Sequence, residues 1–134
     1  MTADELRSIP LFADASAAGL ERLAAAAGEM TSAAGQIVAL EGDRGSGMFV
    51  IVDGTASVEW RGGSVDLGAG TFFGELALLA PGGTRNARVR AATEMRCLAI
   101  PRDDAIALVE SEPTVALTML KEIARRFASA LPES

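Results

Sequence analysis

Short apolar segments separated by glycine-containing turns fill the middle of the chain, from about Met30 to Pro101. Segments of this length are typical of β-strands, and the glycines between them supply the positive φ angles that tight turns need. A spacing of roughly 8–12 residues between such strands predicts a β-sandwich, jelly roll or barrel. The predicted strands are Gln36–Leu40, Met48–Val52, Ala56–Trp60, Val65–Leu67, Arg88–Ala91 and Met95–Ile100.

Helical patterns lie on both sides of this region. Before it, Pro10 ends a short N-terminal helical segment, and Ser16 is the predicted N-cap of a helix that continues to about Gly28. After it, helices are predicted over Arg102–Glu110 and over Pro113–Leu131. The chain shows no internal repeat and no linker to a second domain, so residues 1–134 are predicted to form one domain, mainly β with flanking helices.

The last helix carries a charge bias and an apolar stripe. Glu110 and Glu112 lie where the positive end of its dipole is expected, which favours a helix start at Pro113. The stripe, spaced as one face of a helix, consists of Leu120, Ile123, Phe127 and Leu131.

Composition excludes several classes of protein. The chain is 49% hydrophobic with a net charge of −6, which favours a globular core and opposes direct binding to nucleic acid or anionic lipid. No uncharged apolar run approaches the roughly 18 residues of a membrane-spanning helix, and the acidic N-terminus is unlike a signal peptide. The single cysteine, Cys97, cannot form an internal disulfide, which fits a cytoplasmic location.

The chain contains no histidine, the commonest general base and the commonest transition-metal ligand. We therefore predict no catalytic residue, no metal site and no cofactor. The acidic pair Asp103-Asp104 is expected to lie in the first turn of a helix rather than to bind metal.

One segment combines groups that suit a small anion carrying a hydroxyl. It runs from Phe73-Gly74-Glu75 to Arg85, ten residues after Glu75. Free backbone amides at a helix start and the planar fork of Arg85 would bind phosphate oxygens, with Gly74 allowing close approach. Glu75 would repel a phosphate, so it should accept from a hydroxyl, for which a ribose 2′-hydroxyl is the obvious candidate. The alternative is a Glu75–Arg85 salt bridge that closes the loop with nothing bound.

This segment resembles the phosphate-binding cassette of cyclic nucleotide-binding domains, Phe-Gly-Glu-(Leu/Met)-Ala-Leu, a loop, then Arg-(Ala/Ser/Thr)-Ala. That family includes domains of bacterial cyclic-nucleotide-gated channels, kinase regulatory subunits and the sensor domain of the catabolite activator protein. The resemblance covers nearly the whole chain. Further matching positions are Ile9-Pro10-Leu11-Phe12, Glu41-Gly42-Asp43, Gly45, Met48-Phe49, Asp53-Gly54, Leu67-Gly68-Ala69-Gly70 and Val89-Arg90-Ala91-Ala92-Thr93.

The resemblance implies a jelly-roll-like, double-stranded β-helix barrel over residues 30–101. A helical segment over 1–29 would precede it, and a hinge and lid helix pair over 102–131 would follow. The cassette would span residues 73–87. In the family, the arginine pairs with the cyclic phosphate and the glutamate binds the ribose hydroxyl. Carried over by position, the ligand-binding residues are Gly74, Glu75, Leu76, Ala77, Arg85, Asn86 and Ala87.

Two departures from the family pattern bear on the ligand. Asn86 stands where the family has Ala, Ser or Thr; Ser or Thr favours cyclic GMP in some members, and Ala favours cyclic AMP. The resemblance favours cyclic AMP over cyclic GMP here, although Asn86 leaves the choice of base open. The Glu75-to-Arg85 spacing equals that of the catabolite activator protein and is one residue longer than in kinase-type members.

Some channel-type members place a base-contacting lid residue near Arg126, for which Arg125 is the competing candidate. The alternative for Arg126 is a solvated arginine near a helix C-terminus. Phe127 or Leu131 could instead cap the base, although packing against the domain is the expectation for both.

Three other positions have structural expectations. Trp60 is expected to be a hairpin side chain rather than a stacking platform, and Cys97 a small core residue. Arg88 and Arg90 alternate about Val89 on a predicted strand, so both should face solvent.

These expectations favour a non-catalytic cyclic-nucleotide sensor that acts on an effector protein or an attached effector domain. The main alternative is a degenerate domain that binds other proteins without nucleotide. A cupin-type enzyme would need the histidines that this chain lacks. A transcription factor would need a basic helix-turn-helix segment, which the sequence does not contain.

Overall fold

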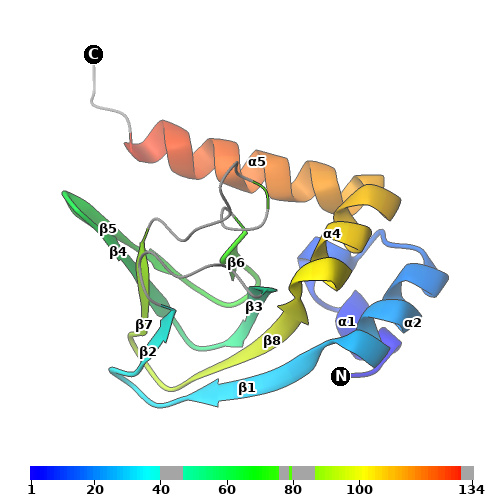
Figure 1. The fold of residues 1–134 in the computed structure, drawn as a ribbon, viewed down its shortest axis with the longest axis horizontal. Helices are drawn as coiled ribbons and strands as arrows, with labels where there is room; N and C mark the ends of the chain where they lie inside the picture. The colour runs from blue at the N-terminus through cyan, green and yellow to red at the C-terminus, as the bar shows by residue number, and fades with distance from the viewer. Residues whose placement is uncertain (40–46, 76–78, 80–86, 131–134) are drawn as a thin grey trace.

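Two antiparallel four-stranded sheets form the centre of the molecule in a computed structural model that describes residues 1–39, 47–75, 79 and 87–130 (Figure 1). The first sheet has the order β1-β8-β3-β6 and the second the order β2-β7-β4-β5. The strands are β1 (Gly28–Ser32), β2 (Ile37–Ala39), β3 (Gly47–Asp53), β4 (Ala56–Trp60), β5 (Gly63–Leu67), β6 (Phe72–Phe73), β7 (Arg88–Ala91) and β8 (Met95–Pro101). The mainly β prediction is confirmed, with two sheets in the described residues rather than one closed barrel.

Each of the six predicted strands overlaps an observed strand, and two further strands were missed. β1 is largely polar and exposed and lies at a sheet edge, so it shows little of the apolar pattern that predicts a strand. β6 has only two residues, too few for any periodicity, and pairs with β3 through Phe49 and Val50.

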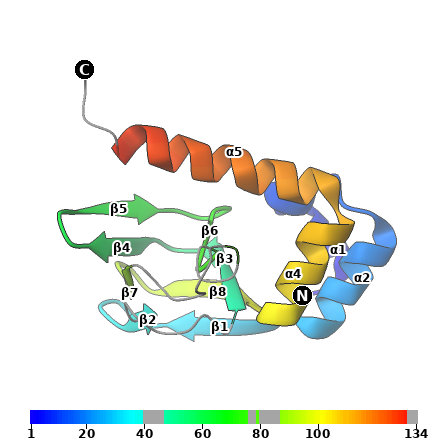
Figure 2. The same ribbon diagram turned by 45° about the horizontal axis from the view of Figure 1, so that its top comes forward.

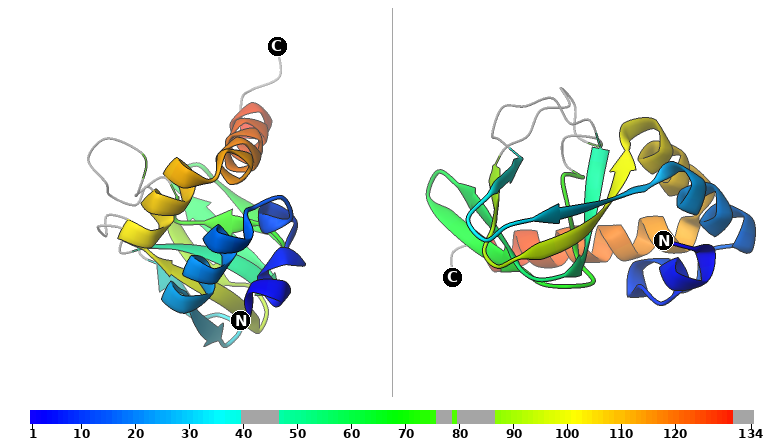
Figure 3. Two further views of the ribbon diagram at one scale, coloured as in Figure 1. Left: turned by 90° about the vertical axis from the view of Figure 1, so that its right-hand side faces the viewer. Right: turned by 90° about the horizontal axis from the view of Figure 1, so that it is seen from below.

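Helices gather at one end of the sheets. They are α1 (Ala3–Arg7), the 3₁₀ turn η1 (Pro10–Phe12), α2 (Ala17–Ala26), α4 (Arg102–Ser111) and α5 (Pro113–Ala130). In the views of Figures 1, 2 and 3, α1, α2 and α4 lie together, and α5 runs from them back alongside the sheets. Within the residues that the structure describes, none of the helices is long and apolar enough to span a membrane.

Several local predictions for the helices are confirmed. Ser16 caps α2, because its hydroxyl accepts from the backbone N–H of Gly19 at 3.0 Å. Asp103 and Asp104 lie in the first turn of α4, and Pro113 opens α5. The prediction that Pro10 ends the first helical segment is not confirmed, because α1 has already ended at Arg7 and Pro10 opens η1.

Two separate apolar clusters pack against opposite faces of the first sheet. The inter-sheet core lies between the sheets and includes Ile51, Phe73 and Cys97. The helix-side core lies on the other face, where Val50 and Phe72 pack among residues of the helices. Successive strand residues point to opposite faces, so the neighbours Phe72 and Phe73 each enter a different core. β6 is therefore held from both sides immediately before the candidate site.

The junction between α4 and α5 is attached to the start of α2. Glu112 Oε1 accepts from the backbone N–H of Ser16 at 2.6 Å and from its hydroxyl at 2.7 Å. The Glu112 side chain also lies against Gly19, where any added Cβ would overlap it. Glu112 directly precedes α5, as the sequence predicted, but its carboxylate binds the N-terminal turn of α2. These two hydrogen bonds from Ser16 lower the pKa of Glu112 below its ordinary value of 4.5.

We expect Glu112→Gln to lower stability at neutral pH and to have less effect in acid. A carboxyl whose pKa is depressed on folding stabilises the fold above its unfolded pKa, and that contribution disappears as pH falls through the lower, folded pKa. Urea midpoints measured from pH 7 to pH 3 should show the wild-type advantage fully above about pH 5 and shrinking below pH 4.5. The control is Glu110→Gln, which changes an exposed glutamate in the last turn of α4, two residues before the junction. An advantage that stayed constant across this range would contradict the assignment.

Candidate functional site

The predicted cassette begins with an anchored turn. The rings of Phe49 and Phe73 stack with centroids 5.0 Å apart and planes 18° from parallel, which fixes the end of β6. Gly74 follows with φ of +89°, a left-handed conformation that L side chains rarely adopt. Beyond Glu75, the backbone N–H of Leu79 donates to the carbonyl oxygen of Glu75 at 3.0 Å. The sequence analysis assigned Gly74 the role of letting a ligand approach the backbone closely. Its positive φ is a second reason for a glycine at this position.

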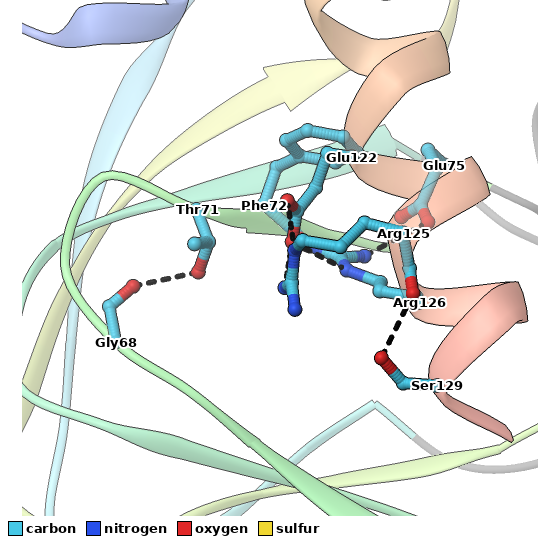
Figure 4. Close-up of polar contacts among 8 residues, drawn as sticks. All are labelled: Gly68, Thr71, Phe72, Glu75, Glu122, Arg125, Arg126 and Ser129. Atoms are coloured by element: carbon cyan, nitrogen blue, oxygen red, sulfur yellow. Dashed lines mark hydrogen bonds and ion pairs between the residues drawn. The ribbon is translucent and has the colours of Figure 1, made fainter.

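Glu75 is a buried carboxylate with a cationic partner from a distant part of the chain. The residue is only 4% exposed. Its Oε1 accepts from Nη1 of Arg126, on α5, at 3.1 Å (Figure 4). A buried carboxylate without donors would be strongly disfavoured, so this pairing is a condition for placing Glu75 inside the domain.

Arg126 contacts the entry to the cassette through its whole guanidinium group. Besides Glu75, Nη2 donates to the carbonyl oxygen of Phe72 at 2.6 Å, and Nε donates to Glu122 at 3.1 Å. Its central carbon also lies 4.7 Å from the centroid of the Phe72 ring, in a cation–π arrangement. The alternative of a solvated arginine is wrong, because the Arg126 side chain is only 17% exposed.

Glu122 positions this guanidinium from within α5. It lies one helical turn before Arg126 and also accepts from Arg125 at 2.6 Å. The arginines, Arg125 first, hold the pKa of the Glu122 carboxyl below its ordinary value although burial opposes this. Arg125 itself is 60% exposed in its side chain, and its guanidinium group points away from Glu75 in Figure 4.

Three of the seven predicted ligand-binding residues lie in the described part of the chain: Gly74, Glu75 and Ala87. Ala87 directly precedes β7 and is half-buried. Leu76, Ala77, Arg85 and Asn86 lie outside the described residues, as does one partner of the alternative Glu75–Arg85 salt bridge. Their assigned contacts therefore remain predictions.

Sequence reasoning missed Phe72 and Glu122 as parts of this cluster. The i, i+4 spacing of Glu122 and Arg126 was a readable signal for an ion pair on one helix face. Nothing in the local sequence indicated that the carbonyl and the ring of Phe72 would bind Arg126, which is 54 residues away.

The remaining candidates behave as structural residues. Trp60 lies at the end of the β4–β5 hairpin, where it pairs with Gly63. Cys97 is fully buried, and burial raises the pKa of its thiol to about 11, so it stays protonated at neutral pH. Arg88 and Arg90 face outward as predicted, and both donate to Glu59, at 2.9 and 3.1 Å. Within the described ranges, no group of three or more metal-binding side chains comes together.

The predicted apolar stripe on α5 does not pack against the domain as a unit. Phe127 is 66% exposed and Leu120 62% exposed, whereas Ile123 lies against the helix-side core. The buried apolar residues of α5 are instead Val115 and Met119. The expectation that Phe127 packs on the domain is therefore wrong, and Leu131 lies outside the described residues.

We expect Glu75→Gln to lower the free energy of unfolding by about 1–3 kcal/mol, since it removes the anionic partner of the buried Arg126 guanidinium. Urea denaturation at pH 7 measures the change. The control is Glu29→Gln, which removes an exposed carboxylate paired with Arg96 and should change stability by less than about 1 kcal/mol. Equal losses for the two variants would show that burial of the Glu75 pair has no energetic consequence.

Comparison with known proteins gives consistent matches over most of the chain. The family model described as "Cyclic nucleotide-binding domain" matches residues 29–112. A cyclic nucleotide-gated potassium channel of Rhizobium etli is 37% identical over 119 residues, which is 89% of this chain and 33% of the channel. The cAMP-dependent protein kinase regulatory subunit of Schizosaccharomyces pombe is 29% identical over 138 residues, 96% of this chain and 33% of that protein.

A solved structure supports the fold over the full length. The crystal structure of a cyclic nucleotide-binding protein from Geobacter metallireducens aligns with a TM-score of 0.79, covering 98% of this chain and 99% of that one at 17% identity. The chain thus spans about a third of the length of the curated relatives that it matches, and the whole of this structural neighbour.

Proposed function

The chain belongs to the cyclic nucleotide-binding domain family, and we propose that it is a non-catalytic sensor that binds a cyclic nucleotide through its cassette and signals through α5. The single observation that carries the proposal is Glu75. This carboxylate is buried at the end of a doubly anchored strand, directly after a glycine with positive φ, at the family's glutamate position.

The proposed chemistry divides the ligand between two charged side chains. Glu75 accepts from the ribose 2′-hydroxyl, because a buried carboxylate is a strong acceptor and would repel the phosphate. Arg85 presents its planar fork to two oxygens of the cyclic phosphate. Backbone amides of Gly74, Leu76, Ala77, Asn86 and Ala87 complete the phosphate cradle. All of these groups bind the ligand through hydrogen bonds and charge pairs alone, so the proposed module releases its ligand chemically unchanged.

We favour cyclic AMP over cyclic GMP. The kinase regulatory subunit that matches nearly the whole chain is cAMP-dependent by name. Asn86 lacks the hydroxyl that favours cyclic GMP in some members of the family, although its amide can donate to the phosphate.

Signalling requires that two positions of α5 differ in their affinity for the ligand. A shift in population from 1:99 to 99:1 needs about 5.5 kcal/mol of differential binding. The relatives are a gated channel and a kinase regulatory subunit, each about three times as long as the aligned part. The recipient of the signal is therefore proposed to be an attached effector domain or a separate effector protein.

One observation favours the second candidate, a degenerate domain that binds proteins without nucleotide. Arg126 already supplies the buried Glu75 with a donor, so the carboxylate does not need a ligand to be stabilised. Titration of wild-type protein with cyclic nucleotide separates the two candidates.

Arg85→Ala should weaken cyclic AMP binding by at least tenfold, because it removes a bidentate, charge-assisted contact to phosphate. Isothermal titration of cyclic AMP into wild type and variant measures the change. Arg88→Ala is the matched control, since this exposed arginine pairs with Glu59 on the outer surface and should leave affinity unchanged. No heat from wild-type protein with either cyclic nucleotide would sink the sensor proposal. Equal affinity of Arg85→Ala and wild type would sink only the phosphate assignment.

Substitutions at position 86 test the choice of base. Asn86→Thr should shift the ratio of cyclic GMP to cyclic AMP affinity upward by about two- to tenfold, the value of one hydrogen bond, and Asn86→Ala should shift it downward. Competition titrations with both nucleotides on the same preparation give the ratio directly. A ratio that both variants leave unchanged would show that residue 86 does not select the base.

A further inference from the structure

We propose that the outer face of α5 is a docking surface for an acidic amphipathic helix of an effector protein. The outer face consists of the exposed apolar residues Leu117, Leu120, Ala124 and Phe127. The proposal deepens the proposed function, and it rests on that function only in taking this partner as the recipient of the signal. The surface itself is defined without any nucleotide.

The outer face is open to solvent along most of the helix. Leu117 is 50% exposed, Leu120 62% and Phe127 66%. A single exposed leucine is ordinary on a protein surface, whereas large apolar side chains aligned on one helix form a patch that is typical of an interaction site. Aromatic residues such as Phe127 are enriched in protein interfaces.

The outer face lies away from the side of α5 that packs on the domain. That side carries Val115 and Met119, which are buried, and Arg126, which binds Glu75. Successive residues of an α-helix are about 100° apart around its axis, so the middle of the outer face points about 140° away from the packed side. In Figure 2, α5 accordingly runs along one edge of the molecule, with the sheets and the other helices on its inner side. A partner can therefore reach the outer face without displacing α5.

The spacing of the outer face indicates what kind of structure would cover it. Its residues follow one another at steps of three, four and three positions. This alternation is the heptad pattern, in which apolar side chains insert between those of a second helix. In the sequence, Leu131 continues the pattern by a further step of four, although it lies outside the described residues. The partner is therefore inferred to be a helix with an apolar stripe of its own.

The charges of α5 indicate which helix fits. Its described residues include three cations and one carboxylate, a net charge of +2, whereas the whole chain has a net charge of −6. The carboxylate, Glu122, accepts from Arg125 and Arg126. Lys121 and Arg125 are exposed and lie on the same flank of the outer face. A helix with glutamates beside its apolar stripe would match this cationic flank.

A second copy of the chain would match the cationic flank less well. In a two-stranded coiled coil, each flank of one helix faces a flank of the other. Two antiparallel copies would bring their cationic flanks together, which is unfavourable. Two parallel copies would place Lys121 against the opposite flank, where Ala116 and Ile123 are both apolar. An acidic helix supplies a carboxylate in either orientation.

The first test uses a synthetic peptide of about four heptads as the probe, with leucine at the first and fourth positions and glutamate at the fifth and seventh. Repulsion between the glutamates opposes pairing of this peptide with itself. The matched peptide has lysine in place of glutamate. Fluorescence anisotropy of each labelled peptide with the full chain, without nucleotide, should show binding at least about tenfold tighter for the glutamate peptide. Equal affinity for the two peptides, or no binding of the glutamate peptide, would overturn the proposal.

The second test locates the bound peptide. Phe127→Ala and Leu120→Ala should each weaken binding of the glutamate peptide by about tenfold or more, because each removes a large apolar side chain from the centre of the contact. Their urea midpoints should stay at the wild-type value, since both side chains are exposed. The control is Ile37→Ala, which shortens an exposed apolar side chain on β2 and should leave peptide affinity unchanged. Wild-type affinity of Phe127→Ala and Leu120→Ala would contradict the assigned surface.

A charge reversal tests the choice of partner. Lys121→Glu should lower the ratio of glutamate-peptide to lysine-peptide affinity by at least about threefold, because it places a carboxylate on the cationic flank. An unchanged ratio would show that this flank does not select an acidic helix.

Other occupants of the outer face would give different results. A wild-type dimer in sedimentation equilibrium that Phe127→Ala converts to a monomer would show that a second copy covers this face. Binding to vesicles of phosphatidylcholine and phosphatidylserine that Phe127→Ala abolishes would show that a membrane covers it. Either result would overturn the proposal, and we expect a monomer that leaves the vesicles unbound. Because these measurements use no nucleotide, their failure leaves the sensor function intact, and a failed cyclic AMP titration leaves the docking surface standing.

Discussion

Burial of one carboxylate organises the contact between the predicted cassette and the last helix of this domain. Glu75 lies at the end of β6 with almost no exposure, and an ionised group in that position requires a donor. Arg126 supplies such a donor from α5, so the last helix is bound to the cassette through an ion pair. The carboxylate that we propose as the acceptor for a ribose hydroxyl thus also binds the last helix.

The sheets support the buried position of Glu75, because they immobilise the residues just before Glu75 in the chain. Phe72 and Phe73 enter two different apolar cores, and the Phe73 ring stacks on Phe49. A strand of two residues would be marginal by itself, yet here both faces are packed. The backbone carbonyl of Phe72 is thereby held where Arg126 can use it, and Gly74 turns the chain toward Glu75.

Local sequence signals predicted most of the strands and helices, but few of the hydrogen bonds between residues far apart in the sequence. Six strands followed from apolar segments between turns, and the α2 cap followed from Ser16. β1 escaped because an edge strand with polar residues has no strong period. Glu75 was predicted as a site residue from its motif, and that assignment stays a prediction. Its bond to Arg126 joins residues 51 positions apart, and the Glu112–Ser16 bond joins residues 96 positions apart. Pairings of that kind depend on the tertiary fold, which neither spacing nor composition encodes locally.

The two hydrogen bonds between Ser16 and Glu112 fix the N-terminal end of α5, so a tilt of the helix displaces mainly its other end. The helix has 18 residues, so at 1.5 Å per residue it is about 27 Å long. With its first turn pinned beside α2, a tilt of about 10° would move its far end by about 5 Å, while the junction hardly shifts. Arg126 lies thirteen residues after Pro113, about 20 Å along this helix, so a displacement at Glu75 reaches the distant end of α5 at nearly its full size. A partner that senses the displacement would therefore gain most from contacting the end of α5 away from the junction.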